Sequence, residues 1–99
     1  MATRTVGDNK HLAGLTSARY VRVTAAGSNL PIRTTSGRLL RVILNTNGAT
    51  VTVKDGLSDI IGIIAIDAPE GSFNYGIFCT NGIYVDVSGA VDCTIVFSD

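Results

Sequence analysis

Few side chains in this chain have the chemistry for nucleophilic, acid-base or metal sites, and they are widely spaced. The 99 residues include one histidine, His11, and two cysteines, Cys79 and Cys93. A nucleophilic triad or a zinc site needs such groups at matched spacing, and neither cysteine has a histidine in its own segment. Cys79 follows an apolar run and Cys93 alternates with apolar residues, so we interpret both as reduced, buried packing residues.

The carboxylates are the other candidate groups, and their spacing favours turns. The segment Asp55-Gly56-Leu57-Ser58-Asp59 looks like a calcium loop but lacks the EF-hand spacing and its terminal Glu. Asp67 and Glu70 share one loop, where two carboxylates are more often solvated than paired as general acid and base. No glycine-rich phosphate loop occurs in the sequence. We therefore expect no catalytic, cofactor or metal site; a small hydrolase is an alternative with almost no residue support.

The composition favours a small domain that is poor in polar surface. Hydrophobic residues make up 45% of the chain and charged residues 16%, against about 25% charged in typical proteins. Either the protein hides apolar surface in an oligomer or on a partner, or Ser, Thr, Asn and Gly cover it. We expect a homo-oligomer. We expect no membrane partner, because no run approaches the about eighteen apolar residues of a membrane span, and no signal peptide.

Charge is divided between the two halves of the sequence. Residues 1–50 carry seven basic side chains and one acid, a net +6, and residues 51–99 carry one base and seven acids, a net −6. Two explanations stay open: the opposite charges pair within one molecule, or they form complementary faces for packing copies or for an acidic partner. Nucleic acid is not an expected partner, because the basic half has one aromatic, Tyr20, and no recognition motif.

Short strands separated by turn residues fill the chain from Tyr20 onward. Period-two patterns bounded by Gly, Asn, Asp and Ser predict strands at 20–24, 30–33, 39–44, 50–54, 60–66, 73–78, 83–87 and 91–97. This spacing predicts an all-β fold: one antiparallel β-sandwich or jelly-roll-like domain of about eight short strands over residues 18–99. Residues 1–17 are polar and basic, with no sustained period. We interpret them as an N-terminal arm that contacts a partner.

Four local features sharpen the expected topology. Pro31 restricts its strand to a sheet edge, because proline donates no ladder hydrogen bond. The strand at 39–44 is apolar on both sides, so we expect it at the centre of a sheet or at an interface. Gly27-Ser28-Asn29 predicts a turn. Asn45-Thr46-Asn47-Gly48 predicts a tight hairpin, because Asn-Gly supplies the positive φ angles that such hairpins need.

Three segments share a turn-and-strand pattern with a known group of proteins. They are SGRLLRVILNT at 36–46, ATVTVKDG at 49–56 and FNYGIFCTNGIYV at 73–85. This succession, within about residues 30–98, resembles small virion proteins of tailed bacteriophages. Members of that family are β-sandwich capsid decoration (cement) proteins or related head and tail surface proteins.

The resemblance implies a structural, non-enzymatic role in the virion, after synthesis in the host cytoplasm. Copies would bind the outer face of the shell of major capsid protein, as trimers at local three-fold positions, and bridge neighbouring subunits. The partner contacts are assigned to basic residues of the arm and its junction, namely Arg4, Lys10, His11 and Arg19. One alternative is a tail, neck or fibre-base component. Another is a carbohydrate-binding module, which would need exposed aromatics in a chain with no Trp and three Tyr.

Overall fold

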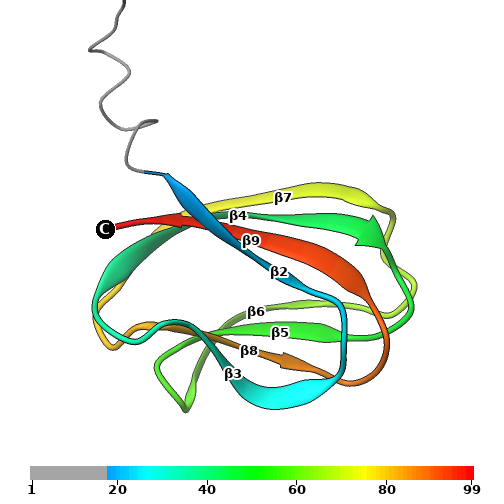
Figure 1. The fold of residues 1–99 in the computed structure, drawn as a ribbon, viewed down its shortest axis with the longest axis horizontal. Helices are drawn as coiled ribbons and strands as arrows, with labels where there is room; N and C mark the ends of the chain where they lie inside the picture. Colours follow the sequence, from blue (N-terminus) through cyan, green and yellow to red (C-terminus); the bar gives the residue numbers. More distant parts are fainter. Residues whose placement is uncertain (1–17) are drawn as a thin grey trace, which may run out of the picture.

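Residues 18–99, which the computed structural model describes, form two antiparallel β-sheets packed face to face (Figure 1). The strands are β2 (Arg19–Val23), β3 (Gly27–Arg33), β4 (Gly37–Thr46), β5 (Val51–Asp55), β6 (Asp59–Ile64), β7 (Gly71–Cys79), β8 (Ile83–Val87) and β9 (Asp92–Ser98). The eight predicted strands and the β-sandwich are confirmed. In this part of the chain no helix is long and apolar enough to cross a membrane.

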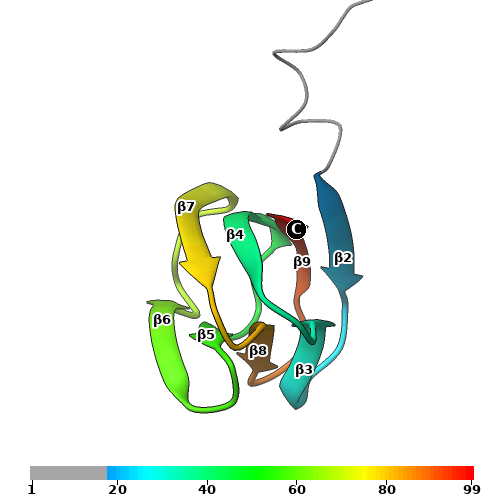
Figure 2. The same cartoon turned by 90° about the vertical axis from the view of Figure 1, so that its left-hand side faces the viewer.

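The strand order winds the chain across both sheets. One sheet has the order β2-β9-β4-β7 and the other β3-β8-β5-β6, and Figure 2 shows them as two layers. The pairs β2·β9, β3·β8, β4·β7 and β5·β6 are nested, and successive pairs alternate between the sheets. This is the order of one long antiparallel hairpin coiled over two layers, and it is the winding that a jelly-roll-like description refers to. Among the described strands, only β5 and β6 form a hairpin of consecutive strands.

The hairpin predicted at Asn45-Thr46-Asn47-Gly48 is wrong. β4 and β5 belong to different sheets, so these residues carry the chain across the sandwich. Gly48 does not adopt the positive φ that a tight hairpin needs. The Nδ2 group of Asn47 instead donates hydrogen bonds to the carbonyl oxygens of Ala65 at 3.2 Å and Ala68 at 2.7 Å. The asparagine therefore fixes the crossing to the loop between β6 and β7, which local sequence does not reveal.

The turn predicted at Gly27-Ser28-Asn29 is also wrong, because these residues open β3. Their pairing with β8 shifts between Gly27 and Leu30, which marks an irregularity of the β-bulge type. Asn29 has φ of 51°, in the left-handed region that Asn tolerates better than most residues. The prediction for Pro31 is confirmed, since β3 lies at the edge of its sheet and pairs only with β8.

The core lies between the sheets and is built from alternate residues of the central strands. Leu39, Val42 and Leu44 of β4 are buried, as are Val51 and Val53 of β5. β4 has neighbours on both sides, β7 and β9, which confirms its predicted central position. Because successive side chains point to opposite faces of a strand, the neighbours of each inward residue lie on the solvent side of the sheet. This alternation decides which side chains form the two outer faces.

Both cysteines belong to this core, as predicted. Cys79 and Cys93 are free thiols with no exposed surface. Burial, with a smaller contribution from the nearby charge of Asp92, raises the pKa of Cys93 to about 11. The pKa of Cys79 is raised by the same cause, with a smaller contribution from Asp55. Both groups are therefore thiols at neutral pH and act as small packing side chains.

Candidate interaction surfaces

The side chains with reactive groups are dispersed in the described part of the chain. Across residues 18–99, no three His, Cys, Asp or Glu side chains lie close enough to hold a metal ion. Asp55 accepts a hydrogen bond from the backbone N–H of Asn81 at 2.9 Å, and Glu70 accepts one from that of Asn47 at 3.2 Å. Each of these two carboxylates therefore connects two loops. Asp55 connects the β5–β6 turn to the β7–β8 turn, and Glu70 connects the β4–β5 crossing to the β6–β7 loop.

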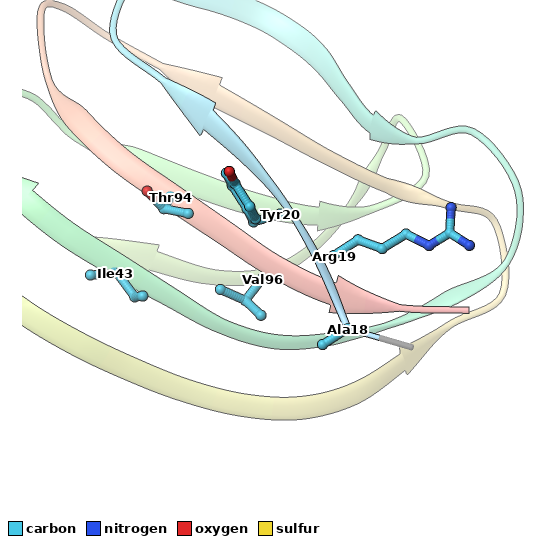
Figure 3. A pocket seen from close by; sticks show the side chains of 6 residues that line it. All are labelled: Ala18, Arg19, Tyr20, Ile43, Thr94 and Val96. Carbon is cyan, nitrogen blue, oxygen red and sulfur yellow. The ribbon is translucent and has the colours of Figure 1, made fainter. Parts of the chain in front are cut away.

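The outer face of the sheet β2-β9-β4-β7 has a shallow apolar hollow. Figure 3 shows Tyr20 of β2 beside Val96 and Thr94 of β9 and Ile43 of β4. The strand register explains the group, because Tyr20 stands opposite Val96 and Ile43 opposite Thr94. Tyr20 is 70% exposed. The hollow, called the sheet hollow below, is lined by Ala18, Arg19, Tyr20, Ile43, Thr94 and Val96.

Arginines lie next to the sheet hollow on the same face. Arg41 is the register partner of Val96, and Arg22 is that of Thr94. Both side chains are exposed. Arg22 forms a two-pronged ion pair with Asp92, at 2.9 and 2.6 Å. Within residues 18–99, Arg41 forms no ion pair, so its charge remains available on this face.

A third arginine on this face lies over an exposed aromatic ring. Arg38 and Phe78 are register partners on β4 and β7, and the guanidinium carbon lies 5.9 Å from the centroid of the ring. Arg38 also donates a hydrogen bond to the carbonyl oxygen of Gly76 at 3.1 Å. The face thus combines exposed apolar groups with positive charge, the composition that favours an apolar partner bearing acids.

Only one of the four residues assigned to partner contact can be placed. Arg4, Lys10 and His11 lie outside the described residues. Arg19 is exposed and forms an ion pair with Asp99 at 3.2 Å. Its guanidinium points away from the centre of the sheet hollow in Figure 3. Arg19 therefore stands at the rim of the surface, with its charge paired inside the molecule.

Ion pairing accounts for part of the charge division between the halves. Arg19 and Arg33 both pair with Asp99, at 3.2 and 2.9 Å, and Arg22 pairs with Asp92. These three ion pairs join the basic half of the sequence to the acidic half. They support pairing within one molecule for those residues, and they leave Arg41 for contacts with other molecules.

A second apolar surface lies along β6, which is an edge strand paired only with β5. Ile60 and Ile63 are 60% and 61% exposed. Ile63 faces outward because its register partner, Thr52, lies between the inward residues Val51 and Val53 of β5, and Ile60 is the register partner of Lys54, which follows Val53. Ile66 follows the strand and is 60% exposed. We call these three isoleucines the β6 apolar edge; the sequence signal for it was the run of isoleucines at 60–66.

Tyr75 covers the inner side of this edge. Its ring extends from β7 to β6, where a Cβ placed on Gly62 would lie 3.1 Å from the tyrosine Oη. Burial raises the pKa of Tyr75 above its ordinary value. The space between the two edge strands is thus filled by a side chain of the same molecule. Only the outward isoleucines remain for a partner.

A buried lysine, which the sequence pattern did not identify, holds the β5–β6 hairpin to the β3 bulge. Alternation places Lys54 on the solvent side of β5, yet it is only 6% exposed. Its Nζ lies 3.0 Å from Asp86 Oδ2, donates to the carbonyl oxygen of Leu57 at 3.2 Å, and donates to the Oδ1 of Asn29. The backbone N–H of Asn29 also donates to Asp86 at 2.6 Å. The network therefore fixes the start of β6.

The comparisons with known proteins give no match to a family model, a curated protein or a solved structure. The features of residues 18–99 that bear on function are therefore the two surfaces. The sheet hollow is apolar and adjoined by arginines, and the β6 apolar edge is adjoined by acids. Exposed apolar surfaces with a polar rim are typical of protein contact sites.

Proposed function

We propose that this chain is a structural, non-enzymatic virion protein that binds the outer surface of a phage capsid and cements neighbouring subunits of the major capsid protein. The proposal assigns capsid contact to the outer face of the sheet β2-β9-β4-β7 and to the arm at residues 1–17. It includes a homo-oligomer, a trimer in the family that the sequence resembles. The virion and the capsid come from that resemblance.

The observation that carries the proposal is the position of the sheet hollow relative to the arm. Ala18, the first described residue, lines the hollow. The arm therefore joins the sandwich next to Tyr20, which carries the largest exposed ring on that face. A partner held by residues 1–17 would meet this face first. The exposed arginines of the face, Arg38 and Arg41, favour an acidic partner surface.

The framework also suits adhesion to a repeated surface. A rigid β-sandwich has little ordering cost on binding. Many copies of a weak contact sum to a strong one when the sites are linked in one shell. Double-sheet β folds with nested winding are common among viral capsid domains, although fold alone does not assign a function.

The copy number in purified virions tests the proposal. We expect the protein in amounts comparable to those of the major capsid protein, measured by quantitative mass spectrometry against labelled peptides of both chains. A few copies per particle would instead indicate a tail, neck or fibre-base component. Absence from virions would contradict both assignments.

A binding experiment tests the assigned surface. Deleting residues 2–17 should leave the melting temperature of the sandwich nearly unchanged and abolish binding to capsids stripped of the protein. Thr35→Lys, a change at an exposed residue of the β3–β4 turn that does not line the hollow, is the control and should bind normally. Unchanged occupancy of the truncated protein would contradict the role of the arm.

A further inference from the structure

We propose that copies of this chain associate head to tail, with the β6 apolar edge of one copy seated in the sheet hollow of the next. The inference rests on the homo-oligomer part of the proposed function and names the two surfaces that meet. A neighbouring copy in the hollow leaves the arm and the Arg38–Phe78 part of the same face for the capsid. It is tested in solution without capsids, so its failure and that of capsid binding are distinguishable.

Charge complementarity identifies the second copy as the occupant. The β6 apolar edge is bracketed by the exposed acids Asp59 and Asp67. The sheet hollow is adjoined by the exposed Arg41, the register partner of Val96. A contact of either surface with its own copy would bring like charges together, which disfavours association. A contact between the two different surfaces brings each acid toward an arginine.

The two surfaces lie in different layers of the molecule. In Figure 2, β6 lies at one edge of the lower layer, whereas the sheet β2-β9-β4-β7 forms the upper layer. One molecule cannot bring its own β6 onto its own hollow, so the contact joins different copies. Heterologous contacts of this kind form rings when the rotation between copies closes and open filaments when it does not.

The exposed isoleucines of β6 support an occupied edge. Edge strands of soluble proteins are commonly protected by proline, lysine or bulges. The edge strand β3 has Pro31 and a shift in register after Gly27. β6 also has one shift in register against β5, but it has neither proline nor lysine between Asp59 and Ile64, and it exposes Ile60 and Ile63. A neighbouring copy would cover these side chains.

Matched lysine substitutions on the two surfaces test the inference. Ile63→Lys places a charge on the β6 apolar edge, and Val96→Lys places one in the sheet hollow. The control is Thr35→Lys in the exposed β3–β4 turn. Sedimentation at micromolar concentration should show an oligomer for the wild type and the control. Each surface variant should raise the apparent dissociation constant at least ~tenfold, which corresponds to about 1.4 kcal/mol, and sediment as a 10.3 kDa monomer.

Mixing the two variants gives the sharpest result. Each retains one intact surface, so an equimolar mixture should form a one-to-one dimer and nothing larger. Dissociation of only the Ile63→Lys variant would indicate contact between two edges, and dissociation of only the Val96→Lys variant would indicate contact between two faces. Either result, or a wild type that is monomeric at every concentration, would overturn the inference.

Two further measurements keep the test sharp. Melting temperatures show whether each variant is folded. If Val96→Lys is not folded, Arg41→Glu replaces it as the hollow variant, because Arg41 is exposed. Arg41→Glu should also weaken association. Capsid binding is measured separately: an intact oligomer that does not bind capsids contradicts the proposed function alone, whereas a monomer that still decorates capsids contradicts the head-to-tail contact alone.

Discussion

Cys93 is a packing residue whose chemistry is suppressed by its surroundings. It has no exposed surface, and its pKa is raised to about 11. The thiolate is the reactive form of cysteine. At neutral pH, burial therefore limits both the access to this sulfur and its ionisation.

We expect both cysteines to resist alkylation in the folded protein. Iodoacetamide should label Cys79 and Cys93 only after denaturation in guanidinium, as followed by mass spectrometry. Cys93→Ala should lower the free energy of unfolding by about 1–2 kcal/mol, at the low end of large-to-small core changes, without changing assembly. Rapid labelling of folded protein, or a disulfide-linked dimer on a non-reducing gel, would contradict this assignment.

The carboxylate of Asp86 makes the stability of the sandwich depend on acid pH. Its pKa is lowered, first by the hydrogen bond from the Asn29 backbone and then by Lys54. Asp92 has a lowered pKa as well, mainly because Arg22 donates to it. In the unfolded chain these groups take up protons near pH 3.8, the ordinary value. The stabilisation is therefore complete above that pH and is lost as pH falls through the lower pKa values of the folded state.

Urea unfolding between about pH 5 and pH 2 measures this loss. The free energy of unfolding of the wild type should fall with pH in that window, and Asp86→Asn should fall less steeply. Asp67→Asn is the control, because Asp67 is exposed and lies outside the ion pairs found in residues 18–99. An identical pH slope for the wild type and Asp86→Asn would show that this carboxylate contributes no acid-dependent stability.

Each strand was predictable from local pattern, but its neighbours were not. The runs at 39–44 and 60–66 are both apolar on two sides in the sequence. β4 became a central strand between β7 and β9, whereas β6 became an edge strand with one neighbour. Pairing depends on contacts distant in sequence, which a period-two pattern does not encode. The exposure of Ile60 and Ile63 follows from this difference.

The sheet hollow could not be predicted for the same reason. Tyr20, Ile43 and Val96 come from three strands, and their meeting requires the first described strand to pair with the last. The sequence-based assignment therefore selected isolated basic residues near the N-terminus, of which Arg19 reaches only the rim. The small number of reactive side chains, by contrast, is a property of the composition.

The side chain of Asn47 helps to hold the crossing between β4 and β5. Asn47 bonds to the carbonyl oxygens of Ala65 and Ala68. Asn47→Ala should lower the free energy of unfolding by about 1–3 kcal/mol, because partly buried acceptors lose their partner. Asn45→Ala is the matched control; its side chain is exposed and makes only long contacts of 3.4 and 3.5 Å. Equal losses for the two variants, measured by urea unfolding, would contradict the role of Asn47.

The whole molecule separates its charges into paired and available groups. The ion pairs of Arg19 and Arg33 with Asp99 use basic side chains inside one copy. Arg41 remains on the face of the sheet hollow, and Asp59 and Asp67 remain beside the β6 apolar edge. The division seen in the sequence thus has two consequences, one for folding and one for contact between molecules.

Reversing the charge of one paired arginine and of one available arginine separates these two consequences. Arg22→Glu breaks the ion pair with Asp92 and should lower the melting temperature slightly. Arg41→Glu should leave the melting temperature unchanged, slow association and flatten its dependence on salt, because exposed charges are screened beyond about 8–10 Å at 0.1–0.15 M ionic strength. Electrostatic steering acts on the association rate more than on the final affinity, so stopped-flow association at several salt concentrations is the decisive measurement. If Arg41→Glu lowers the melting temperature and leaves the salt dependence as in the wild type, the charge of Arg41 serves folding, and the face it occupies is not a contact surface.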